Sequence, residues 1–110
     1  MNEHLEKLKQ GWMSEDIDMM LSACAEDFVY DDPEDGRFTK AQFADYYRGL
    51  PDGETVISDE AVREAEGETT LLYWWAWKRP GETEWAQEGA GLARADASGV
   101  HSERIAYYKR

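Results

Sequence analysis

Apolar residues recur at helical spacing in three segments of the first half of the chain. The first segment predicts a helix that ends near Gly11, and the second predicts a helix whose N-cap is Ser14. The third predicts a helix that begins at Thr39, where Gln42 completes a capping box. In chain order, the apolar positions are Leu5, Leu8 and Trp12; Ile17, Met20, Leu21 and Cys24; and Phe43, Tyr46, Tyr47 and Leu50.

Strand-like segments dominate the rest of the chain. A short strand over 28–30 separates the second and third helices, and Pro33 and Gly36 mark the turn that closes it. Hairpin turns around positions 66–68, 79–82 and 97–99 divide the second half into four long strands, 55–65, 69–79, 84–96 and 102–109. Helices followed by a strand meander indicate an α+β fold, and the length predicts a single domain over 1–110.

The strand over 69–79 is apolar on both faces. Leu71, Tyr73 and Trp75 would share one face, and Leu72 and Trp74 the other. A sheet with one solvated face alternates apolar with polar residues, so both faces of this strand require a cover. Three helices can cover one face only, and we therefore expect a homodimer that forms through the other.

Composition and charge exclude several partners. The 110 residues include 24 acidic and 12 basic side chains, a net charge of −12, so nucleic acid and membrane surfaces are poor partners. The hydrophobic share of 42% is enough for a folded core. A lone cysteine, Cys24, forms no internal disulfide, and no apolar run is long enough to span a bilayer. We expect a cytoplasmic protein.

Asp32 is the candidate catalytic residue. Alternation places it on the same face of its strand as Phe28 and Tyr30, so it would lie at the mouth of an apolar cavity and act as a general base. Pro33 restrains it in an extended conformation. The alternative is that the acidic segment 31–36 is a solvated surface turn.

The sequence favours no metal and no cofactor. The acidic turn lacks the closing acid of a calcium loop, because Gln42 stands at the twelfth position from Asp31. His4 and His101 have no ligand partners at metal-binding spacing, and His101 is expected to be exposed. Chemistry would instead depend on an aromatic pocket for a small apolar molecule. Its expected ligand-binding residues are Phe28, Tyr30, Tyr46, Trp75 and Tyr107.

The chain resembles the SnoaL-like polyketide cyclases, whose superfamily also contains nuclear transport factor 2, ketosteroid isomerases and limonene epoxide hydrolases. The resemblance depends on the order of elements from Leu5 to Tyr108, and on the segments 25–33 and 99–108 with Gly36 between them. It implies a cone-shaped α+β fold, with three helices on the concave face of a curved mixed sheet. It also implies a deep pocket and a dimer that forms through the sheets.

The family's active-site residues match only in part. Ketosteroid isomerases have an Asp before a Pro at the end of this strand as their proton-shuttling base, and Asp32 matches it. Their oxyanion hole needs a Tyr and a protonated Asp, at positions that correspond to the neighbourhood of Leu8 and Gly91. Epoxide hydrolases of this fold carry an acid where Ala106 stands.

Two functions therefore stay open. The chain is a cofactor-independent isomerase, cyclase or dehydratase that uses Asp32 on a carbonyl or polyketide-like compound, or it is a non-catalytic binding or dimerisation module of the same fold.

Overall fold

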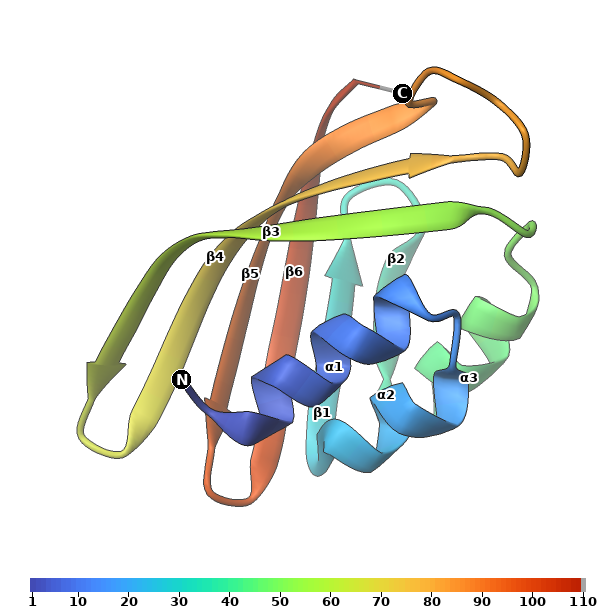
Figure 1. Ribbon diagram of the computed structural model, residues 1–110. Coiled ribbons are helices and arrows are strands. Elements are labelled where there is room, and N and C mark those ends of the chain that lie inside the picture. The colour runs from blue at the N-terminus through green and yellow to red at the C-terminus, as the bar shows by residue number, and fades with distance from the viewer. Residues whose placement is uncertain (110) are drawn as a thin grey trace.

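A curved sheet with helices on one side makes up the protein (Figure 1), and the computed structural model describes residues 1–109. Within these residues there are three helices, α1 (Glu3–Met13), α2 (Ile17–Ala23) and α3 (Lys40–Arg48). The strands are β1 (Cys24–Asp32), β2 (Gly36–Thr39), β3 (Glu54–Ala65), β4 (Glu68–Lys78), β5 (Gln87–Asp96) and β6 (Gly99–Lys109). The α+β class and the curved mixed sheet are confirmed.

The sheet has the strand order β2-β1-β6-β5-β4-β3. Neighbouring strands are antiparallel except β1 and β6, which are parallel, with Tyr30 paired to Glu103. This parallel pair joins the short strand of the first half to the last strand of the meander. It places the inward-facing residues of β1 and β6 side by side beneath the helices.

For two helices, the predicted N-cap residue can be compared with the N-cap residue in the structure. The capping box of α3 is confirmed, because Thr39 accepts from the backbone of Gln42 and the Gln42 side chain accepts from the backbone of Thr39. The predicted N-cap of α2 is wrong. Asp16 accepts from the Met19 backbone at 3.0 Å, whereas Ser14 follows the last turn of α1. Asp16 is an equally good capping residue, and the two-residue shift lengthens the turn.

The first strand is longer than the sequence predicted. It begins at Cys24, which the helical spacing had placed on α2, and it continues to Asp32. A further strand, β2, pairs with its end, where the sequence indicated a turn alone. Gly36 has a φ of 113°, which glycine tolerates, and so allows this tight hairpin.

Cys24 is buried in the core as expected, and burial raises the pKa of its thiol to about 12.

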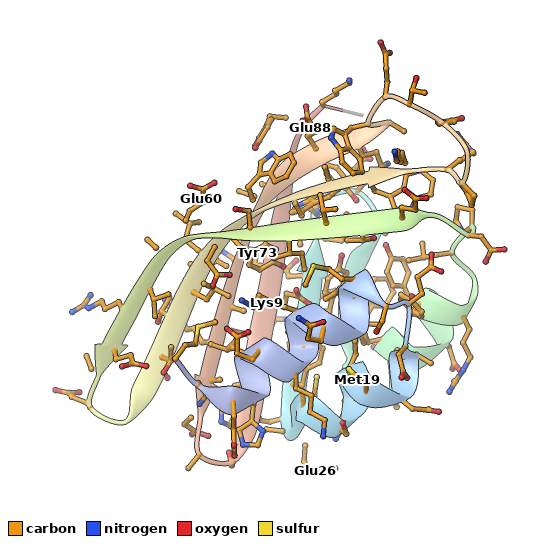
Figure 2. All side chains as sticks on the ribbon, viewed as in Figure 1. Lys9, Met19, Glu26, Glu60, Tyr73 and Glu88 are labelled. Atoms are coloured by element: carbon orange, nitrogen blue, oxygen red, sulfur yellow. The ribbon has the colours of Figure 1, made fainter. Side chains whose placement is uncertain are left out.

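The helix side of the sheet holds the hydrophobic core. Leu71, Tyr73 and Trp75 of β4 are buried there, whereas Leu72 on the other face is 42% exposed. Figure 2 shows Tyr73 on the helix side of the sheet. Gly91 of β5 lies so close to the Tyr73 ring that a Cβ atom would come within 2.0 Å of it, so a larger residue does not fit at this position. Among the described helices, none has the length and apolar character that a bilayer crossing requires.

Candidate functional site

An aromatic cavity of about 490 Å³ opens on the helix side of the sheet. The exposed residues on its lining, among them Arg48, Leu50, Asp52 and Arg79, mark its mouth, whereas the buried Tyr30 and Tyr73 lie deepest. Its aromatic lining residues come from α1, α3 and three strands, β1, β4 and β6: Trp12, Tyr30, Tyr46, Tyr47, Tyr73, Trp75, Trp77 and Tyr107.

The structure brings together four of the five residues that the sequence assigned to ligand binding. Tyr30, Tyr46, Trp75 and Tyr107 all line the cavity. Phe28 lies instead in the hydrophobic core, where it is 1% exposed and makes an edge contact with the Phe43 ring at 5.5 Å. Phe28 lies two residues before Tyr30 on the same face of β1, which places it under the cavity and not on its lining.

Asp32 is buried behind the cavity lining and is 2% exposed. Its Oδ1 accepts from the backbone N–H groups of Glu34 at 2.8 Å and Asp35 at 3.1 Å, which fixes the β1–β2 hairpin. Its Oδ2 accepts from the Tyr107 hydroxyl at 2.8 Å. The Tyr46 hydroxyl lies 3.4 Å from the same oxygen, but its shorter hydrogen bond, 2.6 Å, is to Oδ2 of Asp35. The carboxylate therefore reaches the cavity through two tyrosine hydroxyls, and the acidic turn is not simply a solvated surface segment.

A second buried carboxyl group belongs to Glu103 of β6, which is 1% exposed. The Trp12 indole N–H donates to it, with 3.1 Å from Nε1 to each carboxyl oxygen, and the Tyr73 hydroxyl donates to Oε2. Burial raises the pKa of Glu103 to about 7, although both hydrogen bonds act to lower it. A carboxyl group that titrates near neutrality is suited to proton transfer.

The sequence contained a signal for Glu103 that was not used. Among the acidic residues, the sequence pattern singled out Asp32 alone as catalytic. Glu103 alternates with Ile105 and Tyr107 along β6, and both of these line the cavity. Strand alternation therefore turns Glu103 toward the same side of the sheet.

The two carboxyl groups share one arrangement. We call Asp32 with Tyr46 and Tyr107 the Asp32 cluster, and Glu103 with Trp12 and Tyr73 the Glu103 cluster. In each cluster a buried carboxyl group lies within hydrogen-bond distance of two aromatic side chains that line the cavity. Burial is the main cause that raises the pKa of all three tyrosines well above its ordinary value, so their hydroxyls keep their protons.

The positions that the family resemblance singled out carry other roles. Leu8 is a core residue, 2% exposed, and Gly91 packs on the ring of Tyr73. Ala106 pairs with Ala90 of β5 and faces away from the cavity. Tyr73 on β4 and Glu103 on β6 form one hydroxyl–carboxyl pair at the cavity, and Tyr107 and Asp32 form another.

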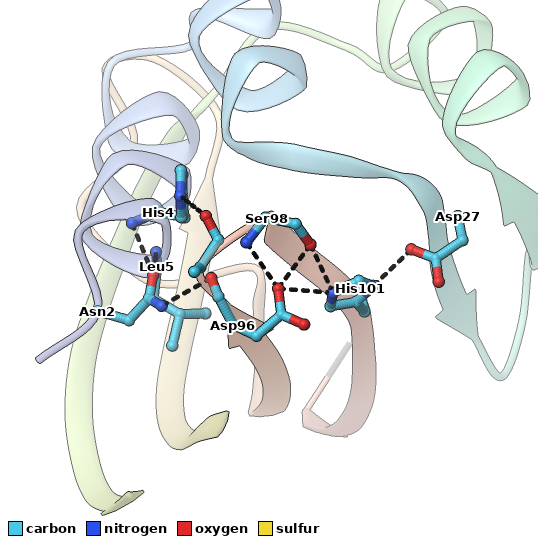
Figure 3. Close-up of polar contacts among 8 residues, drawn as sticks. Asn2, His4, Leu5, Asp27, Asp96, Ser98 and His101 are labelled. Atoms are coloured by element: carbon cyan, nitrogen blue, oxygen red, sulfur yellow. Dashed lines mark hydrogen bonds and ion pairs between the residues drawn. The ribbon is translucent and has the colours of Figure 1, made fainter. Parts of the chain in front are cut away.

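A separate polar cluster lies at the β5–β6 turn, outside the cavity (Figure 3). The ring of His101 contacts Asp96 at 2.9 Å and Ser98 at 3.1 Å through Nε2, and Asp27 of β1 through Nδ1. Asp96 first, and then Asp27, raise the pKa of His101. Contact between both ring nitrogens and carboxylates stabilises an imidazolium that ties the turn to β1.

Within residues 1–109 there is no group of three or more His, Cys, Asp or Glu side chains placed to hold a metal ion.

Comparisons with known proteins support the fold. No protein-family model matches the sequence, and no curated protein matches it significantly. Solved structures do match, several of them described as cystatin-like or NTF2-like. The fold implied by the family resemblance is therefore confirmed.

Three of these structures are informative. A protein with a ketosteroid isomerase-like fold from Catenulispora acidiphila, in complex with trimethylamine, matches with a TM-score of 0.74 and 17% identity over 97% of this chain and 86% of its own. An LEH-like epoxide hydrolase of M. tuberculosis has a TM-score of 0.73, 14% identity and coverage of 96% and 80%. The Δ5-3-ketosteroid isomerase of a Mycobacterium species has a TM-score of 0.70, 16% identity and coverage of 94% and 89%.

Proposed function

We propose that the chain binds one small, largely apolar organic molecule in the aromatic cavity. The observation that carries this proposal is a cavity of about 490 Å³ whose aromatic lining is anchored by two buried carboxyl groups. Ligand sites are typically hollows of roughly 300–1,000 Å³, mostly apolar, with a few fixed polar groups. A core that needed only stability would fill this volume, because an empty cavity costs packing energy.

Relatives of the same fold support small-molecule binding. The Catenulispora protein was solved with trimethylamine, and two other neighbours are enzymes described as an epoxide hydrolase and a ketosteroid isomerase. In the present chain, ring faces of the cavity would hold the apolar part of the molecule. The hydroxyls of Tyr46, Tyr73 and Tyr107, each oriented by its carboxylate, would contact its polar atoms.

A titration of 2-naphthol by calorimetry tests this proposal. Thr55→Trp places an indole on the cavity lining and should abolish binding, whereas Arg63→Trp adds the same side chain to an exposed site of the same strand and should not. Equal affinities of the two variants, or no heat with the unmodified protein at millimolar 2-naphthol, would contradict the proposal.

A second candidate function is proton transfer on a bound carbonyl compound without a cofactor, as in an isomerase, cyclase or dehydratase. The pKa of Glu103, about 7, favours it, because an acid–base group works best when it titrates near the working pH. Asp32 stays our proposed general base. Its Oδ2 is 2.8 Å from the Tyr107 hydroxyl, which lines the cavity and can relay a proton.

The conversion of cyclohex-3-enone to cyclohex-2-enone, followed by ultraviolet absorption, tests this candidate. Asp32→Asn should abolish the rate, and Glu103→Gln should reduce it, while Glu60→Gln on the exposed surface serves as the matched control. A rate that is the same in all three variants and in buffer would leave binding as the function.

We also propose a homodimer that forms through the uncovered face of the sheet, in a cytoplasmic protein. Leu72 is 42% exposed on that face, and its partner on β5 is the apolar Leu92. Trp74, on the same face, makes an edge contact with the Trp85 ring at 6.4 Å. A second copy would cover this apolar surface.

A further inference from the structure

We propose that the molecule bound in the cavity carries a positive charge, in the form of an alkylated ammonium group. This inference depends on the proposed small-molecule binding and adds the chemical class of the ligand. It follows from three features of the cavity: the orientation of its rings, the buried negative charge behind them, and the charges at its mouth.

Two pairs of rings on the cavity lining stand at steep angles. Trp12 and Tyr47 are 5.6 Å apart at 74°, and Trp75 and Tyr107 are 5.3 Å apart at 83°. Rings at right angles surround a space from several sides, as a stack of parallel rings does not. A cation within about 6 Å of a ring face is attracted by the ring's quadrupole. Alkyl groups on that cation add apolar contact and need no hydrogen-bond acceptors.

The negative charge behind the lining has no cation to balance it. Among residues 1–109, Glu103 forms no ion pair, and its hydrogen-bond donors are the neutral side chains of Trp12 and Tyr73. A buried carboxylate without a counter-ion is costly. A cation in the cavity would lower this cost, and a ligand carboxylate would increase it.

Hydrogen bonds couple this charge to the rings. An indole N–H or a phenol O–H that donates to a carboxylate gains electron density on its ring, so the ring face attracts a cation more strongly. Trp12 and Tyr73 donate to Glu103, and Tyr107 donates to Asp32. The rings of all three donors belong to the cavity lining.

Charges at the mouth are consistent with entry of a cation. Three acidic residues line the cavity, Glu15, Asp35 and Asp52. The basic residues that line it have partners of their own: Arg48 pairs with the exposed Asp45 at 3.7 Å, and Arg79 lies at 5.6 Å over the ring of Trp77, itself a lining residue. The net charge of −12 also attracts cations from solution.

Choline and 3,3-dimethyl-1-butanol provide the test, because they have nearly the same shape and differ in charge. Calorimetric titration of the unmodified protein at pH 8 should show choline binding at least tenfold tighter than the neutral alcohol. Glu103→Gln should remove most of this preference. Glu60→Gln changes the net charge equally at an exposed site and should retain it.

The outcomes separate this inference from the proposed function. Equal affinities for choline and the alcohol, tighter binding of the alcohol, or no choline binding at 10 mM would overturn the inference that the ligand is positively charged. The 2-naphthol titration then decides on its own whether the cavity binds small molecules. The comparison of choline with the alcohol uses the unmodified chain, so it stands even where Glu103→Gln does not fold.

Discussion

Tyr30 on β1 and Glu103 on β6 are partners in the parallel pair of the sheet. Because strand residues two apart share a face, Asp32 lies on the same face as Tyr30, two residues further along β1. Two residues along a strand and one strand across place the Cα atoms of Asp32 and Glu103 roughly 8 Å apart. The register therefore positions both buried carboxyl groups under one cavity.

Glu103 should make the stability of the protein fall as pH rises. Its pKa is about 7 in the folded chain and 4.5 is its ordinary value, so between these values the unfolded chain loses a proton that the folded chain keeps. The free energy of unfolding should therefore fall by about 3 kcal/mol across this window on account of this one group.

Urea unfolding at pH 5 and pH 8 measures this effect. Glu103→Gln should lack the fall attributed to Glu103, and Glu60→Gln should retain it. Cys24 and Tyr30, the neighbouring titratable groups, keep their protons over this range because their pKa values are raised by burial. A pH dependence that is identical in all three proteins would show that Glu103 is not desolvated.

Tyr107→Phe should destabilise the fold although it removes a single oxygen. The change takes away the donor 2.8 Å from Oδ2 of Asp32, a carboxylate that is 2% exposed. Loss of a hydrogen bond to a buried charged group costs about 1.5–3 kcal/mol. Tyr108→Phe makes the same change at a side chain that is 64% exposed and should cost less than about 0.5 kcal/mol. Equal unfolding midpoints for the two variants would contradict the Asp32 cluster.

His101 should titrate above its ordinary value of 6.5, because Asp96 and Asp27 stabilise the imidazolium. Its contribution to stability is fully present below pH 6.5 and is lost as pH rises through the higher pKa of the folded chain. A titration of the ring by NMR measures the pKa directly, and Asp27→Asn should lower it. A His101 pKa at or below 6.5 in the unmodified protein would contradict the contacts of this cluster.

The uncovered sheet face should mediate dimer formation. Light scattering at micromolar concentration should give about twice the chain mass of 12.7 kDa. Leu72→Glu places a charge at the exposed apolar position and should yield a monomer, whereas Val62→Glu, on the opposite side of the sheet, should not. A monomer before substitution would leave Leu72 and Trp74 as exposed surface.

Local signals predicted most of the fold. The capping box at Thr39, the hairpin turns and the apolar run of β4 each depend on a few neighbouring residues. The resemblance supplied the curved sheet. The parallel pairing of β1 with β6 is a contact between residues more than seventy positions apart, and no local pattern determines it.

The candidate site was predicted in part for the same reason. Alternation within β1 placed Asp32 and Tyr30 on one face, and both lie inward. Alternation could not show that the hydroxyls of Tyr46 on α3 and Tyr107 on β6 would lie within hydrogen-bond distance of Oδ2 of Asp32. Glu103 was missed because its burial depends on α1 and β4, which supply Trp12 and Tyr73.

The measurement that tests the central claim most directly is a carbon-13 NMR titration of the Glu103 carboxyl group, with and without a ligand in the cavity. We expect a pKa of about 7 in the free protein and a clear shift when 2-naphthol or choline is bound. A pKa near the ordinary 4.5 that does not move with either compound would contradict a buried carboxyl group that acts on the cavity.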